Sequence, residues 1–261
     1  MSDEIKEVVK RTYTEVVKND SGCGCGPSCC SPAEEVGFNE NYSNIAGYEQ
    51  EADYALGCGI PTEFAKIKEG GTVLDLGSGA GNDVFVARSI VGDKGKVVGV
   101  DFTEAMIAKA NENKHKLGYQ NIEFLLGDIE ALPLNDNLID VAVSNCVMNL
   151  VPDKAKAYKE VYRVLKPGGH FSISDIVLSG DLPQSIKEVA EMYAGCVSGA
   201  MIREDYIAAI KNAGFRNITI VKERKLDLSD ELILQYATPK ALSEFRKMDG
   251  AVFSITVYAD K

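Results

Sequence analysis

A buried strand that runs into a glycine-rich turn constrains the fold of this chain more than any other feature of its sequence. Val73–Leu76 is a short apolar run interrupted only by Asp75, residues 77–81 read Gly-Ser-Gly-Ala-Gly, and apolar residues at helical spacing follow through Val84 and Ala87. Glycine adopts positive φ and lets a ligand approach the backbone, and the start of the next helix presents N–H groups to that ligand. The pattern predicts a strand–turn–helix unit with a ligand at the turn, although a tight turn without a ligand would read the same way.

Strands and helices alternate after this unit. Further strands are expected at Lys96–Val100, Ile122–Leu126, Val141–Ser144 and Phe171–Ser174, with helices at 103–117 and Lys154–Leu165 and a turn at Lys166–Gly169. Such alternation is typical of a parallel sheet whose right-handed connections place helices on both faces. We therefore expect an α/β fold with a doubly wound, Rossmann-like sheet.

The two ends of the chain depart from this pattern. Residues 4–18 have the spacing of a short amphipathic helix, and Ser21–Cys30 is too rich in glycine and cysteine for regular structure. Residues 181–213 read as helical, and Ile218–Lys222 and Val252–Tyr258 as strands at the sheet edge. The expected division is an N-terminal helix and Cys-rich segment (1–41), an α/β domain (42–180) and a C-terminal α+β extension (181–261).

Charge and cysteine content limit the partners of the chain. Its 261 residues carry a net charge of -11, and an acidic surface repels the phosphates of nucleic acids and anionic membranes, so neither is an expected partner. No apolar run approaches the roughly 20 residues that span a bilayer, and the acidic N-terminus is unlike a signal peptide. Seven cysteines without an export signal predict a cytoplasmic protein whose cysteines are core residues, ligands or reactive thiols.

Two further acids follow predicted strands. Asp101 ends the second strand, where doubly wound folds place a carboxylate on the ribose of a nucleotide. Asp128 follows the third strand, at a position where an adenine amino group could be met. A solvated strand end or a helix N-cap would account for Asp101 equally well, but with Asp75 the three acids line one crevice.

Four segments together resemble the class I S-adenosylmethionine-dependent methyltransferases: Val73–Gly81, Val98–Asp101, Gly127–Glu130 and Leu165–Gly169. The resemblance implies that Asp75 and the glycines hold the methionine end of the cofactor, Asp101 the ribose, and Asp128 with Ile129 the adenine. The turn lacks the Gly-x-Gly-x-x-Gly spacing expected of an NAD enzyme. The candidate cofactor-binding residues are Asp75, Gly77, Ser78, Gly79, Gly81, Asp101, Phe102, Met106, Asp128, Ile129 and Asn145.

The methyl acceptor is indicated by cysteines. A general base is common in methyl transfer to oxygen, nitrogen or carbon, and neither of the two histidines lies where one is expected. Cys146 follows the fourth strand, Cys58 lies between two glycines, and Cys196 follows one, and such glycines suit close approach of the backbone to something bound. Each alone is more often a core residue, but three thiolates suit a soft trivalent centre whose lone pair attacks a methyl group without losing a proton.

Leu56–Gly59, Ser144–Lys154 and Gly195–Ala200 resemble, in order and context, the arsenite methyltransferases. The resemblance implies that Cys146 and Cys196 bind arsenic(III) throughout the cycle and that Cys58 is a third ligand. It also implies a more N-terminal cysteine that forms a disulfide with Cys58 during turnover, a role that Cys23, Cys25, Cys29 and Cys30 could each take. The expected substrates are S-adenosylmethionine and arsenite or an arsenic–thiol conjugate, with glutathione or thioredoxin as reductant.

Other interpretations remain open from the sequence. The same fold could methylate a carbon of a quinone-like small molecule, or bind a metalloid without turnover. The Cys-rich segment could bind metal, deliver arsenic, supply a resolving thiol or be a tail with reactive thiols, and its spacing is not that of a zinc knuckle.

Overall fold

The computed structural model describes residues 2–18, 40–180, 199–226, 230, 231, 234, 238–247 and 252–261. The strands are β1 (Thr72–Leu76), β2 (Lys96–Asp101), β3 (Ile122–Leu126), β4 (Ile139–Asn145), β5 (Leu165–Leu178), β6 (Met201–Ile202), β7 (Arg216–Leu226) and β8 (Val252–Asp260). The helices are α1 (Ser2–Lys18), α2 (Pro61–Phe64), α3 (Asn82–Val91), α4 (Glu104–Leu117), α5 (Lys154–Val164), α8 (Arg203–Asn212) and α10 (Pro239–Lys247), with short 3-10 turns at Gln50–Ala52 and Met148–Leu150.

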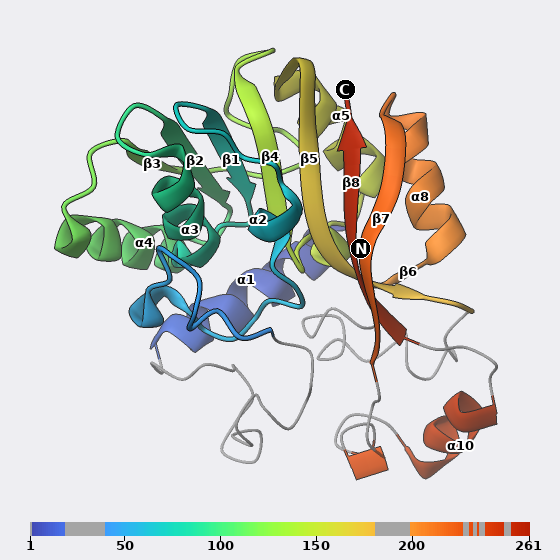
Figure 1. Ribbon diagram of the computed structural model, residues 1–261. Coiled ribbons are helices and arrows are strands. Elements are labelled where there is room, and N and C mark those ends of the chain that lie inside the picture. Colours follow the sequence, from blue (N-terminus) through green and yellow to red (C-terminus); the bar gives the residue numbers. More distant parts are fainter. Residues whose placement is uncertain are drawn as a thin grey trace.

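The strands form one sheet in the order β3-β2-β1-β4-β5-β8-β7, and β6 pairs with β5 (Figure 1). The first five strands run parallel, whereas β8 runs antiparallel to both β5 and β7. The strand order reverses between β1 and β4, and in doubly wound sheets the ligand crevice opens at that point, beyond the carboxyl ends of the strands. The predicted α/β class and both late strands are confirmed, although only β7 lies at the sheet edge, since β8 pairs with β5 on one side and β7 on the other.

Helices cover both faces because side chains alternate along each strand. Leu74 and Leu76 of β1 pack in a buried cluster with α5 and α8, whereas Val73 packs on the opposite face with α3 and α4. The clusters hold large, fully buried side chains such as Tyr158 and Phe85. The core therefore lies in two layers, one on each side of the sheet.

The sequence-based prediction fails at two described places. Lys166–Gly169 is part of β5 rather than a turn before it: the register passes from Ile139 opposite Leu165 to Val141 opposite His170, so these residues bulge opposite Asp140. Met201–Ile202 was expected to be helical and instead forms β6, with the helix beginning at Arg203. Residues 181–198 of the predicted helical region lie outside the described residues.

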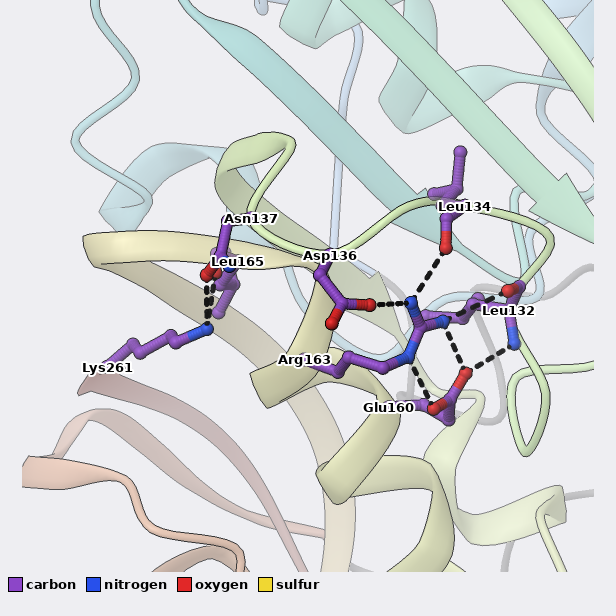
Figure 2. Close-up of polar contacts among 8 residues, drawn as sticks. All are labelled: Leu132, Leu134, Asp136, Asn137, Glu160, Arg163, Leu165 and Lys261. Atoms are coloured by element: carbon purple, nitrogen blue, oxygen red, sulfur yellow. Dashed lines mark hydrogen bonds and ion pairs between the residues drawn. The ribbon is translucent and has the colours of Figure 1, made fainter.

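The connection between β3 and β4 is fastened to α5 by Arg163, as Figure 2 shows. The guanidinium of Arg163 donates to the carbonyls of Leu132 and Leu134, at 3.1 and 2.8 Å, and to Asp136 at 2.7 Å. Glu160 accepts both from Arg163 and from the Leu132 N–H. This cluster holds the segment that follows Asp128 in place.

In the part of the chain that the structure describes, none of the helices combines the length and apolar character needed to cross a membrane.

Candidate active site

A cleft with about 1070 Å³ of space, its open mouth included, lies at the carboxyl ends of β1, β2 and β4. It is lined by every predicted cofactor-binding residue except one: Asp75, Gly77, Ser78, Gly79, Asp101, Phe102, Met106, Asp128, Ile129 and Asn145. Cys146 lies in the same wall. The exception is Gly81, which precedes α3 with φ +104° and packs against the ring of Phe85.

The glycine turn is held by the neighbouring strand. The N–H groups of Gly77 and Ser78 donate to the carbonyl of Val100, and the Gly79 N–H donates to Asp101 at 3.0 Å. Gly77 has φ +70°, and a Cβ there would lie 2.5 Å from Val147, so the turn sits directly against the residue after Cys146. A Cβ on Gly79 would meet only Met106, at 3.9 Å, which leaves room for a ligand.

Three buried acids, Asp75, Asp83 and Asp101, give the cleft its electrostatic character. Burial raises the pKa of Asp75, with repulsion from the other two adding to it, and burial raises the pKa of Asp101 against hydrogen bonds from Thr103 and Gly79. Burial also raises the pKa of Asp83 to about 6, although hydrogen bonds from Asn145 and Tyr42 oppose the shift. A cationic ligand would stabilise the ionised form of all three acids. A sulfonium that also carries an ammonium group fits this cleft.

Helix α1 supplies part of the wall, which the sequence did not indicate. Lys6, Val9 and Tyr13 line the cleft. The Lys6 ammonium lies 2.6 Å from Asp128 and 2.9 Å from Glu130. The amphipathic pattern of α1 predicts a buried face but not the surface that it covers, because the contact with Asp128 spans 122 positions of sequence.

Cys146 and Cys58 are buried in one apolar cluster, together with Val9, Leu150, Ile176, Leu178, Leu226, Ala241, Phe245 and Val252. Cys146 has φ +61°, and its N–H donates to the carbonyl of Ser174 at 2.8 Å. Cys58 is fully buried and does not line the cleft. Among the described residues no three His, Cys, Asp or Glu side chains are grouped to hold a metal ion.

The other predicted thiols, Cys196, Cys23, Cys25, Cys29 and Cys30, lie outside the described residues. Their predicted roles remain predictions.

The backbone at the glycines beside Cys58 approaches a different group from the one that the sequence suggested. Glycine on both sides of Cys58 indicates that another group lies close to the backbone there. From the sequence, that group was expected to be a bound ligand. In the structure a Cβ on Gly57 would lie 2.5 Å from Asn145 Nδ2, and a Cβ on Gly59 would lie 2.5 Å from Ser174 Oγ. The close approach is to side chains of the protein itself.

Comparisons with known proteins agree with this geometry. The family profile described as a methyltransferase domain matches residues 67–233. The arsenite methyltransferase of Halobacterium salinarum is 38% identical over 256 residues, which cover 93% of this chain and 64% of that protein. The arsenite methyltransferase of Aquipseudomonas alcaligenes is 32% identical, with 88% of this chain and 67% of that protein covered.

A solved structure is similar as well. The crystal structure of an arsenic(III) S-adenosylmethionine methyltransferase from Chlamydomonas reinhardtii matches with a TM-score of 0.68 and 32% identity, covering 88% of this chain and 73% of that one. The chain spans 64% and 67% of the length of the two curated relatives. It therefore belongs to the methyltransferase-domain family and, within that family, to the arsenite methyltransferases.

Proposed function

We propose that this chain transfers a methyl group from S-adenosylmethionine to trivalent arsenic held by cysteine thiolates. The observation that carries the proposal is the position of Cys146, which follows β4 and lines the same cleft as Asp75 and Asp101. A thiolate at this point can hold a soft acceptor beside the cofactor. The names of the curated relatives support the same substrate.

The cofactor would be held by groups that line the cleft. Asp75 and the open side of Gly79 would take the methionine end, Asp101 the ribose, and Asp128 with Ile129 the adenine. The buried acids would stabilise its positive charge. When bound, this cofactor supplies an electrophilic methyl group to the arsenic lone pair.

The acceptor is arsenite or a thiol conjugate of it, and it exchanges onto Cys146, Cys58 and Cys196. Each thiol loses its proton on binding, so arsenic binding weakens as pH falls. No base is needed afterwards, because arsenic bound to three sulfurs keeps a lone pair. Arsenic gives up two electrons on forming its bond to carbon, so a thiol reductant such as glutathione or thioredoxin must return two electrons to regenerate the trivalent product.

The C-terminal region 181–261 completes the arsenic site in this proposal. Leu226, Ala241, Phe245 and Val252 belong to this region and pack in the same cluster as Cys58 and Cys146. An apolar surrounding excludes water from the arsenic–sulfur bonds, which water would otherwise hydrolyse. Thiolates must also stay reduced, which favours the cytoplasm. The role that we propose for arsenic methylation there is detoxification.

The test is transfer of labelled methyl to arsenite with glutathione or thioredoxin present, measured for wild type and for Cys146→Ser, Cys58→Ser and Cys196→Ser. We expect Cys146→Ser and Cys196→Ser to lose transfer by at least about 100-fold, while S-adenosylmethionine binds within about twofold of wild type. Transfer to arsenite at the wild-type rate in Cys146→Ser would refute thiolate catalysis. Tight arsenite binding without transfer in wild type would instead identify a binding protein.

A further inference from the structure

The side-chain amide of Asn145 joins the end of β4 to the backbone around Cys58. Its Oδ1 accepts from the N–H groups of Cys58 at 3.0 Å and Gly59 at 3.3 Å. Its Nδ2 lies within hydrogen-bond distance of the Gly59 carbonyl at 2.9 Å, the Tyr42 hydroxyl at 2.9 Å and Asp83 at 3.1 Å. An amide has two acceptor lone pairs and two donor hydrogens, so the protein itself uses all of them.

Asp83 fixes the orientation of this amide. An ionised carboxylate only accepts hydrogen bonds, so the NH₂ end of Asn145 must face Asp83 and its oxygen must face Cys58. The Tyr42 hydroxyl lies 2.9 Å from the Gly59 carbonyl and 3.0 Å from Asp83, and it donates its one hydrogen to either. The three side chains therefore form a connected buried cluster, in which each helps to orient the next.

The Cys58 backbone is held from other sides as well. The Ser254 hydroxyl of β8 donates to the Cys58 carbonyl at 2.6 Å. The glycines on either side let the backbone press against Asn145 and Ser174, where any Cβ would clash. Both polar groups of the Cys58 backbone thus have a partner from the sheet, Asn145 for the N–H and Ser254 for the carbonyl.

We propose that Tyr42, Asp83 and Asn145 are positioning residues for the methyl acceptor, which hold the backbone of Cys58 so that its thiol stays in the buried cluster with Cys146. The inference rests on the proposed function. It also changes the role expected of Asn145 from the sequence, since an amide saturated by the protein orients a cysteine rather than binding the cofactor. Asp83 and Asn145 line the cleft, so the cluster connects the cofactor side of the site to the acceptor side.

The experiment compares Asn145→Ala, Asp83→Asn and Tyr42→Phe. The first readout is the rate at which iodoacetamide alkylates Cys58 and Cys146 in the substrate-free protein, measured by mass spectrometry. We expect the alkylation rate of Cys58 relative to Cys146 to rise about tenfold in Asn145→Ala and Asp83→Asn, because one or two net hydrogen bonds are lost. Tyr42→Phe, which keeps the ring in place, should give about a threefold rise.

Asn121→Ala is the matched control. The Asn121 amide also joins two backbone segments, since its Nδ2 donates to the carbonyls of Gly92 and Gly95 and its Oδ1 accepts from Arg88, but it lies at the amino end of β3. General loosening would raise the alkylation of both cysteines in this variant as well. A change in their ratio only in the Tyr42, Asp83 and Asn145 variants supports the proposal.

The second readout separates the two substrates. We expect the KM for arsenite to rise about tenfold in Asn145→Ala while the dissociation constant of S-adenosylmethionine changes less than about threefold. An unchanged alkylation ratio in folded variants, or a loss of cofactor affinity with an unchanged KM for arsenite in Asn145→Ala, would overturn the positioning role. If wild type fails to methylate arsenite but the alkylation ratio changes as expected, the proposed function fails and the positioning of Cys58 stands.

Discussion

Asp75, Asp83 and Asp101 line the cleft without a hydrogen bond or ion pair to any lysine or arginine of the described ranges, whereas Glu160 and Asp136 both contact the guanidinium of Arg163 (Figure 2). The pKa of Glu160 is lowered chiefly by its hydrogen bond to Arg163, while burial raises the pKa of Asp75, Asp83 and Asp101. Acids that pair with a cation of the chain stabilise the fold. Acids left unbalanced weaken the fold and remain available to a cationic ligand.

Replacing Arg163 should have the largest effect on stability. Arg163→Met removes the donors to two carbonyls of the β3–β4 connection and leaves Glu160 without its cation, so the free energy of unfolding should fall by about 2–3 kcal/mol. Urea unfolding measures this change, and titration calorimetry should show S-adenosylmethionine binding within about twofold of wild type. A variant as stable as wild type would show that the acids paired with Arg163 do not stabilise the fold more than the cleft acids do.

Replacing Asp101 should weaken cofactor binding without lowering stability, which is the opposite of the effect expected for Arg163. Asp101→Asn removes a buried negative charge from the cleft, so S-adenosylmethionine should bind about 10- to 100-fold more weakly, which is about 1.4–2.8 kcal/mol. The unfolding free energy of the ligand-free protein should stay equal or rise, because the buried charge is gone. Unchanged affinity for the cofactor would remove Asp101 from the binding site.

The pH dependence of stability should separate the two regions. A carboxyl group with a raised pKa binds more protons in the folded state, so its contribution to stability is complete below about pH 4 and is lost as pH rises through its folded pKa. With the pKa of Asp83 raised to about 6, and that of the buried Asp175 of β5 raised by burial to about 7, the ligand-free protein should lose stability between pH 5 and pH 8.

Glu160 has a lowered pKa and titrates below this window. Urea unfolding at several pH values, with and without S-adenosylmethionine, checks the expectation: the cation should reduce the slope. Stability that rises from pH 5 to pH 8 in the ligand-free protein would contradict it.

Replacing Lys6 should have the smallest effect. Lys6 is the one described cation at the cleft wall, and it pairs with Asp128 and Glu130. In Lys6→Met the unfolding free energy should fall by less than about 1 kcal/mol, and the cofactor affinity should change less than about threefold, because such ion pairs contribute little. Thermal denaturation and calorimetry measure both quantities. A tenfold loss of affinity would make α1 part of the cofactor site rather than its cover.

Local patterns in the sequence predicted the elements that carry the cofactor side of the site. The strands β1 to β4 and the acids at or near their carboxyl ends were placed correctly, since alternation of apolar residues, glycine turns and strand ends are short-range signals. The bulge at Lys166–Gly169 was missed because Pro and Gly are as typical of a turn as of a bulge. Only the pairing with β4 keeps these residues in the strand.

The sequence by itself determined the fold class, the acids at the strand ends and the cysteine after β4, because each depends on residues close together in the chain. Only the tertiary structure decided which surface α1 covers, which side chain the glycines beside Cys58 approach, and that Tyr42 and Asp83 orient Asn145. These contacts join residues 122, 87 and 103 positions apart, for Lys6 with Asp128, Cys58 with Asn145, and Tyr42 with Asn145. Their partners are chosen by the packing of the whole sheet and by the need to satisfy buried polar groups, neither of which has a local signature.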